Sequence, residues 1–98
     1  MKNIVYNRLL QGGYRVYAGK YYNHEIDFYA TKEREHFYIQ VGNLFESQNA
    51  LNKKLRPLKA INDNYPKVLL SLDKKLDEDY SGIRHINLID FCLNDSNL

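Results

Sequence analysis

The apolar run KVLLSL, at residues 67–72, constrains the fold of this chain more than any other stretch. A strand exposed on one face alternates apolar and polar residues, whereas an unbroken apolar run is typical of a strand buried on both faces. The preceding residues 46–62 place leucine and isoleucine at helical spacing, with basic residues away from that stripe. A helix that leads into such a strand indicates a crossover between parallel strands. These two segments therefore predict an α/β domain with a mixed central sheet flanked by helices.

The rest of the chain supplies further strands and two more helices. Residues 2–11 carry one apolar helical stripe and end at Gly12-Gly13, a pair that stops helices. Residues 73–82 read as an acidic loop, and residues 83–93 as a short strand followed by a helix. Three strands rich in aromatic and β-branched residues are predicted at 14–19, 24–31 and 36–42.

The predicted element order is therefore α-β-β-β-α-β-β-α, in a single domain at residues 1–98. A hydrophobic fraction of 44% and a charged fraction of 27% favour an ordinary globular protein over a disordered or membrane chain. Pro57 is expected to kink the second helix or to mark a new start, because proline lacks an amide donor. A single cysteine, Cys92, excludes an internal disulfide and a cysteine-built zinc site, and it is expected in the core.

Neither a membrane segment nor an export signal is indicated. No apolar run approaches the roughly 18 residues that span a membrane. The start MKNIVYNRLL meets Asn7 and Arg8 too early for a signal peptide. We therefore expect a cytoplasmic protein with no membrane partner.

Alternation within two strands sorts their side chains onto two faces. If residues 24–31 and 36–42 pair as a hairpin, Asp27 and Gln40 share a polar face, and Glu25 points the same way as Asp27. Asp27 is then either a carboxylate bonded to tyrosine or backbone donors, or a former metal position, and Gln40 fits a bridge between strands. The opposite, apolar set forms a core face that consists of Ile26, Phe28, Ala30, Phe37, Ile39 and Val41.

The charge distribution and the aromatic content point to polyanions as partners. Residues 1–72 carry 11 lysines and arginines against 6 acidic residues. A basic stripe on the second helix either binds phosphates or is a solvated face, because a half-buried helix must present polar groups to water. Tyr21 and Tyr22, in a polar loop, are candidates for contacts with bases or a partner. The stripe comprises Lys53, Lys54, Arg56 and Lys59.

Several blocks in order, NIVYNRLLQGGYRVYAGK, EIDFYA, FYIQV, LRPLKAINDNYPKVLLSLD and GIRHINLIDFCL, resemble a known family. The chain is similar to the C-terminal domain of unknown function of a group of prokaryotic AAA-type ATPases, which itself resembles restriction-endonuclease-like, PD-(D/E)XK folds. The resemblance implies attachment to an ATPase core. That core would carry a loop of the type G-x-x-x-x-G-K-[ST], and nothing in this chain matches it, because Gly12-Gly13 is followed by Tyr14.

The resemblance also implies where a nuclease site would lie. Active members of the wider fold use one strand acid, an acidic-x-Lys triplet on the next strand, and often a first-helix glutamate; the carboxylates hold Mg²⁺, which lowers the pKa of water. Asp27 matches the first acid. The triplet falls on Gln40, Val41 and Gly42, and Lys2 stands near the glutamate position. An amide and a glycine therefore replace the second carboxylate and the lysine.

Three functions remain open from the sequence. The leading one is a catalytically degenerate nuclease-fold module that binds nucleic acid or a protein partner and needs no cofactor. The second is a Mg²⁺-dependent phosphodiesterase with a rearranged site, in which Asp27 and Glu25 bind metal beside Gln40 and Lys53 or Lys54 replaces the missing lysine. The third is an assembly domain that docks on the ATPase or on a second copy, and the sequence leaves the oligomeric state undetermined.

Overall fold

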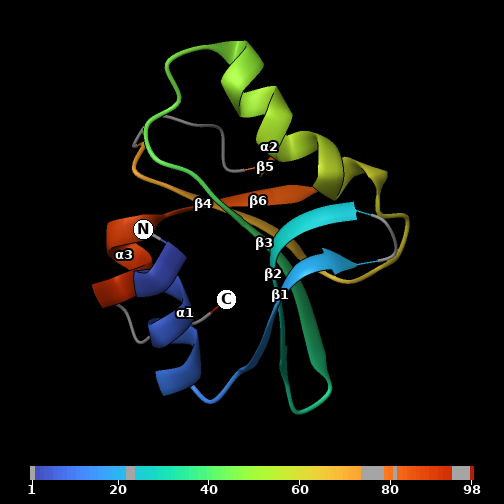
Figure 1. The fold of residues 1–98 in the computed structure, drawn as a ribbon, viewed down its shortest axis with the longest axis vertical. Coiled ribbons are helices and arrows are strands. Elements are labelled where there is room, and N and C mark those ends of the chain that lie inside the picture. Colours follow the sequence, from blue (N-terminus) through green and yellow to red (C-terminus); the bar gives the residue numbers. More distant parts are fainter. Residues whose placement is uncertain (1, 22–23, 74–78, 81, 94–97) are drawn as a thin grey trace.

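The computed structural model describes residues 2–21, 24–73, 79–80, 82–93 and 98. Its described strands pair in the order β1-β2-β3-β4-β6-β5 (Figure 1). Helices α1 and α3 pack on one face of this sheet, and α2 packs on the other. The predicted α/β domain with a mixed, helix-flanked sheet is therefore confirmed. The elements are α1 (Lys2–Gln11), β1 (Arg15–Tyr21), β2 (His24–Lys32), β3 (Glu35–Val41), α2 (Gln48–Ala60), β4 (Lys67–Ser71), β5 (Asp79–Tyr80), β6 (Ile83–Asn87) and α3 (Leu88–Leu93).

Strand directions change in the middle of the sheet. β1, β2 and β3 form an antiparallel meander, whereas β3, β4 and β6 run parallel, with α2 as the crossover between β3 and β4. β4 is buried on both faces, as its apolar run predicts. Val68 and Leu70 join the core under α1 and α3, while Leu69 joins the core under α2. Cys92 packs half-buried at the edge of the first core.

Helix α2 is shorter than predicted and passes through its proline. Ser47 caps its start, because the Ser47 hydroxyl accepts a hydrogen bond from the Ala50 N–H at 3.2 Å. The helix therefore begins at Gln48 rather than at residue 46. It continues through Pro57 to Ala60 without a new start. None of the described helices is long and apolar enough to cross a membrane.

Two features of the sheet correct the sequence prediction. Asp79–Tyr80 form the short strand β5 inside the stretch predicted as loop, and they pair antiparallel with β6. Strand β2 also contains a bulge. Ala18 on β1 pairs with Phe28 on β2, but the next residue, Gly19, pairs with Ile26, so one residue of β2 is skipped. The bulge leaves Asp27 as the extra residue. The single core face predicted for β2 is therefore wrong, because Ile26 packs under α2 while Phe28 packs under α1.

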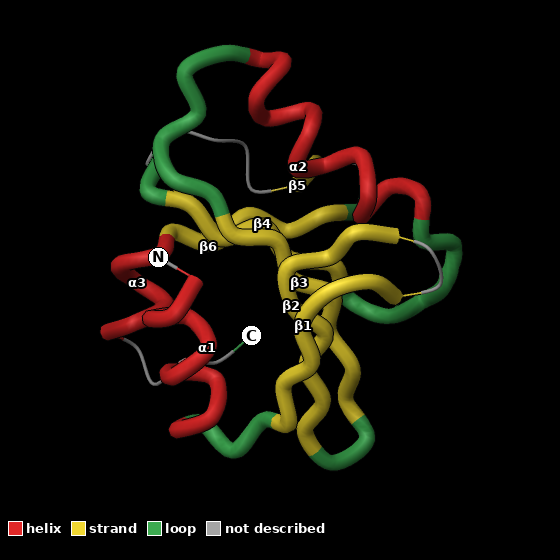
Figure 2. The backbone as a smooth tube through the Cα atoms, in the orientation of Figure 1, coloured by secondary structure: helices red, strands yellow, loops and turns green. Residues whose placement is uncertain are grey.

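The sheet extends beyond its helical cover. Figure 2 shows the β2–β3 hairpin tip at the opposite end of the molecule from the start of α2. At the other end, β3 leads into the loop before α2, and the first turn of α1 lies near the ends of the strands. The candidate site lies at this second end.

Candidate functional site

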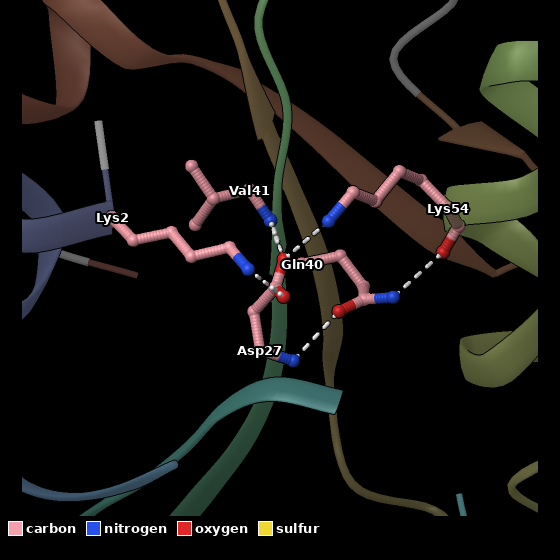
Figure 3. Close-up of polar contacts among 5 residues, drawn as sticks. All are labelled: Lys2, Asp27, Gln40, Val41 and Lys54. Atoms are coloured by element: carbon pink, nitrogen blue, oxygen red, sulfur yellow. Dashed lines mark hydrogen bonds and ion pairs between the residues drawn. The ribbon is translucent and has the colours of Figure 1, made fainter. Parts of the chain in front are cut away.

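The site is built where the backbone pairing of β2 and β3 stops. The register ends at Phe28 opposite Ile39, one residue short of the bulge at Asp27. Beyond that point hydrogen bonds between side chains and backbone join the two strands in place of backbone–backbone hydrogen bonds (Figure 3). The Val41 N–H donates to Asp27 Oδ2 at 2.8 Å, and the Asp27 N–H donates to Gln40 Oε1 at 2.7 Å. Asp27 and Gln40 meet across the hairpin, and their side chains replace the missing strand hydrogen bonds. The polar face predicted for them is wrong, because Gln40 is buried on the side of the sheet that α2 covers, where Ile26 and Tyr38 form a second core.

Two lysines from different helices close on Asp27 (Figure 3). Lys54, on α2, places Nζ 2.8 Å from Asp27 Oδ2, and Lys2, at the start of α1, places Nζ 3.0 Å from Asp27 Oδ1. The Asp27 side chain is only 11% exposed, whereas those of Lys54 and Lys2 are 30% and 58% exposed. Both oxygens of a nearly buried carboxylate are thus neutralised by ammonium groups that reach solvent.

Gln40 fixes the position of α2 relative to the sheet. Its side chain is buried, and Nε2 donates to the backbone carbonyl of Lys54 at 3.2 Å. The Gln40 amide therefore accepts a hydrogen bond from β2 through its oxygen and donates one to α2 through its nitrogen. A carboxylate at this position has no proton to donate to that carbonyl. Gln40 thus acts as the bridge that the sequence allowed, and it extends that bridge from the strands to the helix.

The contacts of Asp27 keep its carboxyl ionised. Burial raises the pKa of this group, but hydrogen bonds from Lys54, Val41 and Lys2 outweigh burial and hold the pKa below its ordinary value. Asp27 therefore remains an anion across the physiological pH range. Its negative charge is paired with the ammonium groups of Lys2 and Lys54.

A cleft of about 990 Å³ opens over this network, between the start of α1, the loop after β3 and helix α2. Lys2, Lys53 and Lys54 line it, together with Asp27 and Glu25, so its ionisable side chains carry one net positive charge. Arg56 and Lys59 are exposed on α2 and are not among the residues lining the cleft. The predicted basic stripe is therefore divided: two of its members face the cleft and two lie outside it.

The position of the expected catalytic lysine is blocked. Gly42 follows β3, and a Cβ atom built on it would lie 2.4 Å from Cζ of Phe45. Such a contact is too close for any side chain unless the Phe45 ring moves. The loop is held in place, because the Phe45 N–H donates to Asp73 Oδ2 at 3.0 Å. Phe45 therefore occupies the space that a side chain at position 42 would need, and Lys54 brings an ammonium group to Asp27 from α2 instead.

The donor set does not suit Mg²⁺. That ion favours carboxylate oxygens and dehydrates reluctantly. Here the one nearly buried carboxylate is paired with two ammonium groups, and its neighbour is an amide whose oxygen already accepts a backbone N–H. Within the part of the chain that the structure describes, no group of three or more His, Cys, Asp or Glu residues is placed to hold a metal.

Sequence reasoning found part of this site and missed part of it. It placed Asp27 and Gln40 together and left Lys53 and Lys54 as alternatives for a lysine beside them, but it treated Lys2 only as a reversed charge and did not predict its ion pair with Asp27. The side chains of Tyr21 and Tyr22 lie outside the described residues. A second polar cluster was missed: Ser71 Oγ lies 2.8 Å from Nε2 of His85, and Asp73 is hydrogen-bonded to the same hydroxyl. Only strand register brings these residues together.

The chain is similar to part of a longer protein. No family model matches the chain. It is similar to an uncharacterized protein of Haemophilus influenzae, at 36% identity over 98 residues that cover 95% of this chain. The chain spans about a fifth of that relative's length, since the matched region is 22% of it.

Proposed function

We propose that this domain is a catalytically degenerate module of the restriction-endonuclease-like fold that binds nucleic acid in the cleft over Asp27. One observation carries the proposal: both oxygens of Asp27 are held by lysine ammonium groups. The resemblance assigns this carboxylate to the metal site of the fold's nucleases. Exchanging a metal for fixed ammonium groups removes the means of activating water and keeps the attraction for phosphate. The domain would therefore bind a phosphodiester without cleaving it.

The charges of the cleft fit a phosphate ligand. Lys2 and Lys54 keep part of each side chain in solvent while paired with Asp27, and Lys53 is exposed at the same cleft. Ammonium groups contact phosphates as point charges, and binding of this kind weakens as salt rises. Asp27 holds two of the three lysines in fixed positions, which lowers the entropy lost when a phosphate binds.

The wider assignment rests on the element order and on the similarity to a longer relative. The element order α-β-β-β-α-β and the carboxylate of Asp27 in the first half of β2 are features expected of the PD-(D/E)XK fold. We infer attachment to an AAA-type ATPase core from the resemblance, and the relative's greater length leaves room for such a core in that protein. The module would act in the cytoplasm, where a prokaryotic cell keeps its nucleic acid.

A second candidate is a Mg²⁺-dependent phosphodiesterase with a rearranged site. It is favoured by Lys54, because that hypothesis requires a lysine from α2 to reach Asp27, and the two side chains are in contact. Glu25 also lines the cleft. Lys2 counts against it, because a metal bound to Asp27 would have to displace a second ammonium group.

Removing the cleft lysines tests the proposal. Fluorescence anisotropy of a labelled oligonucleotide is measured against salt for the wild type, for Lys53→Gln/Lys54→Gln, and for the control Lys59→Gln, an exposed lysine on α2 outside the cleft. The double variant should bind more weakly and lose about 1–2 units from the slope of log K against log salt. Lys59→Gln should resemble the wild type. Equal losses in both variants would overturn the cleft as the binding site.

A further inference from the structure

A row of aromatic side chains crosses the sheet surface next to the cleft. It runs from Tyr17 on β1 through Tyr29 on β2 and His36 on β3 to Tyr65 in the loop before β4, and these four residues are here called the aromatic row. Ring centroids lie 6.0 Å apart for Tyr17 and Tyr29, 5.9 Å for Tyr29 and His36, and 4.5 Å for His36 and Tyr65. Four elements or loops thus contribute one ring each to a single surface.

The aromatic row is open to solvent at both ends. Tyr17 is 54% exposed and Tyr65 is 43% exposed, and both rank among the large exposed side chains of the described chain. Tyr29 and His36, between them, are half-buried. Exposed aromatic side chains that lie together on one surface are characteristic of contact sites.

The rings are held in place from below. Tyr38 is fully buried, its ring centroid lies 5.4 Å from that of Tyr29, and its hydroxyl donates to Asp63 Oδ2 at 2.6 Å. Asp63 also accepts the Tyr65 N–H at 2.9 Å and binds Lys67 Nζ at 3.0 Å, so the loop that carries Tyr65 is fixed to β3 and β4. A row of rings fixed in this way loses little conformational entropy when it binds a ligand.

The aromatic row lies next to the lysine cleft along two strands, although none of its four residues lines the cleft. On β2, Tyr29 follows the site residue Asp27 by two positions, and on β1 Tyr17 adjoins Ala18, which lines the cleft. Tyr29 packs at the edge of the core under α2, the same side of the sheet from which Gln40 reaches that helix. Arg15, two residues before Tyr17 on the same strand, adds an exposed cation on that face.

This arrangement suits one ligand class. Flat rings beside lysines bind a chain that alternates anionic groups with π-faces, which is single-stranded nucleic acid. In a duplex the base faces are already stacked on each other, so an aromatic row on a sheet cannot reach them. Stacking needs no base-specific hydrogen bonds, and such a surface tolerates many sequences.

We propose that the aromatic row binds unpaired bases of a single strand whose phosphates lie in the lysine cleft. This inference rests on the proposed function and specifies its ligand: single-stranded rather than duplex nucleic acid. Tyr17 is the stacking residue with the largest exposed surface in the row.

The test distinguishes the contribution of the bases to binding from the contribution of the phosphates. Anisotropy is measured with labelled oligothymidylate, with an abasic oligonucleotide of the same length and charge, and with a duplex. The wild type should bind oligothymidylate about 5-fold or more tightly than the abasic strand, the gain expected from stacking on one ring. Tyr17→Ala should lose that gain and keep its affinity for the abasic strand. Tyr17→Phe should retain the gain. Tyr6→Ala, an exposed tyrosine on α1, is the matched control.

A spectroscopic readout makes the test independent of affinity. The chain has no tryptophan, so Tyr17→Trp supplies the sole indole. Its fluorescence should be quenched by oligothymidylate and unchanged by the abasic strand. Circular dichroism shows whether each variant is folded.

The outcomes distinguish the two proposals. Equal, lysine-dependent binding of the abasic strand and oligothymidylate would overturn the aromatic row and leave the cleft proposal standing. Tighter binding of the duplex would also overturn the row. Binding of neither strand would overturn both proposals.

Discussion

At the scale of single residues, Asp27 connects three elements through one carboxylate. It accepts a hydrogen bond from Val41 on β3, and it pairs with Lys54 on α2 and with Lys2 on α1. Hydrogen bonds to charged groups contribute about 1.5–3 kcal/mol each. Asp27 is therefore both a stability determinant and the group that positions the cleft lysines.

The pH dependence of stability should report this role. Because the folded pKa of Asp27 lies below its ordinary value of about 3.9, the stability it contributes is present above that pH. It is lost as pH falls through the folded pKa. Chemical denaturation between pH 7 and pH 3 should show a smaller acid loss for Asp27→Asn than for the wild type. Asp63 also has a lowered pKa, so part of the slope should survive in Asp27→Asn. An unchanged slope would contradict the ion pairs.

Gly42 provides a second residue-scale prediction. Gly42→Ala should destabilise the fold by about 1–3 kcal/mol, because its Cβ would overlap the Phe45 ring. Phe45→Ala removes the obstacle, so the double variant should be more stable than the sum of the two single effects predicts. Urea denaturation of the four proteins measures this coupling. Strict additivity would show that the ring does not occupy this space.

At the scale of elements, the sequence predicted the features that periodicity determines and missed those that depend on strand register. The unbroken apolar run of β4 indicates a strand buried on both faces, and the helical spacing of leucines in α2 indicates an amphipathic helix. β5 has two residues, too few to show alternation. The bulge at Asp27 reverses the face of Ile26 without any turn residue in β2 to mark it, and Lys2 reaches Asp27 only because α1 packs beside the strand ends.

The cluster of Ser71, Asp73 and His85 links β4 to β6. Asp73 also accepts the N–H of Phe45, which lies in the loop after β3. Burial lowers the pKa of His85, although the charge of Asp73 opposes this shift. As pH falls below about 6.5, His85 is therefore protonated in the unfolded chain before it is protonated in the folded protein. This difference lowers the stability of the folded state. Unfolding free energy should fall between pH 7 and pH 5, and His85→Gln should reduce this fall.

His36→Gln is the matched control for the cluster, because His36 is half-buried at the other end of the sheet. The reduction measured for His85→Gln should exceed any change measured for His36→Gln. A slope that disappears in His36→Gln and persists in His85→Gln would contradict the assignment to the cluster.

At the scale of the whole molecule, the proposed module would be a nuclease-like frame in which lysines stand at the position of a metal. The mixed sheet brings the start of α1, the first half of β2 and helix α2 to one cleft, and the aromatic row crosses neighbouring strands of the same sheet. Phosphates and bases would then be bound at neighbouring places on one surface. The frame would provide recognition without a means of activating water.

The most direct measurement mixes the protein with an end-labelled single strand in EDTA and then in Mg²⁺ or Mn²⁺. Anisotropy reports binding, and a denaturing gel reports strand length. We expect salt-sensitive binding of similar strength with and without metal, and a strand that stays intact. Metal-dependent cleavage that is lost in Asp27→Ala would contradict the degenerate module and would establish the rearranged phosphodiesterase instead.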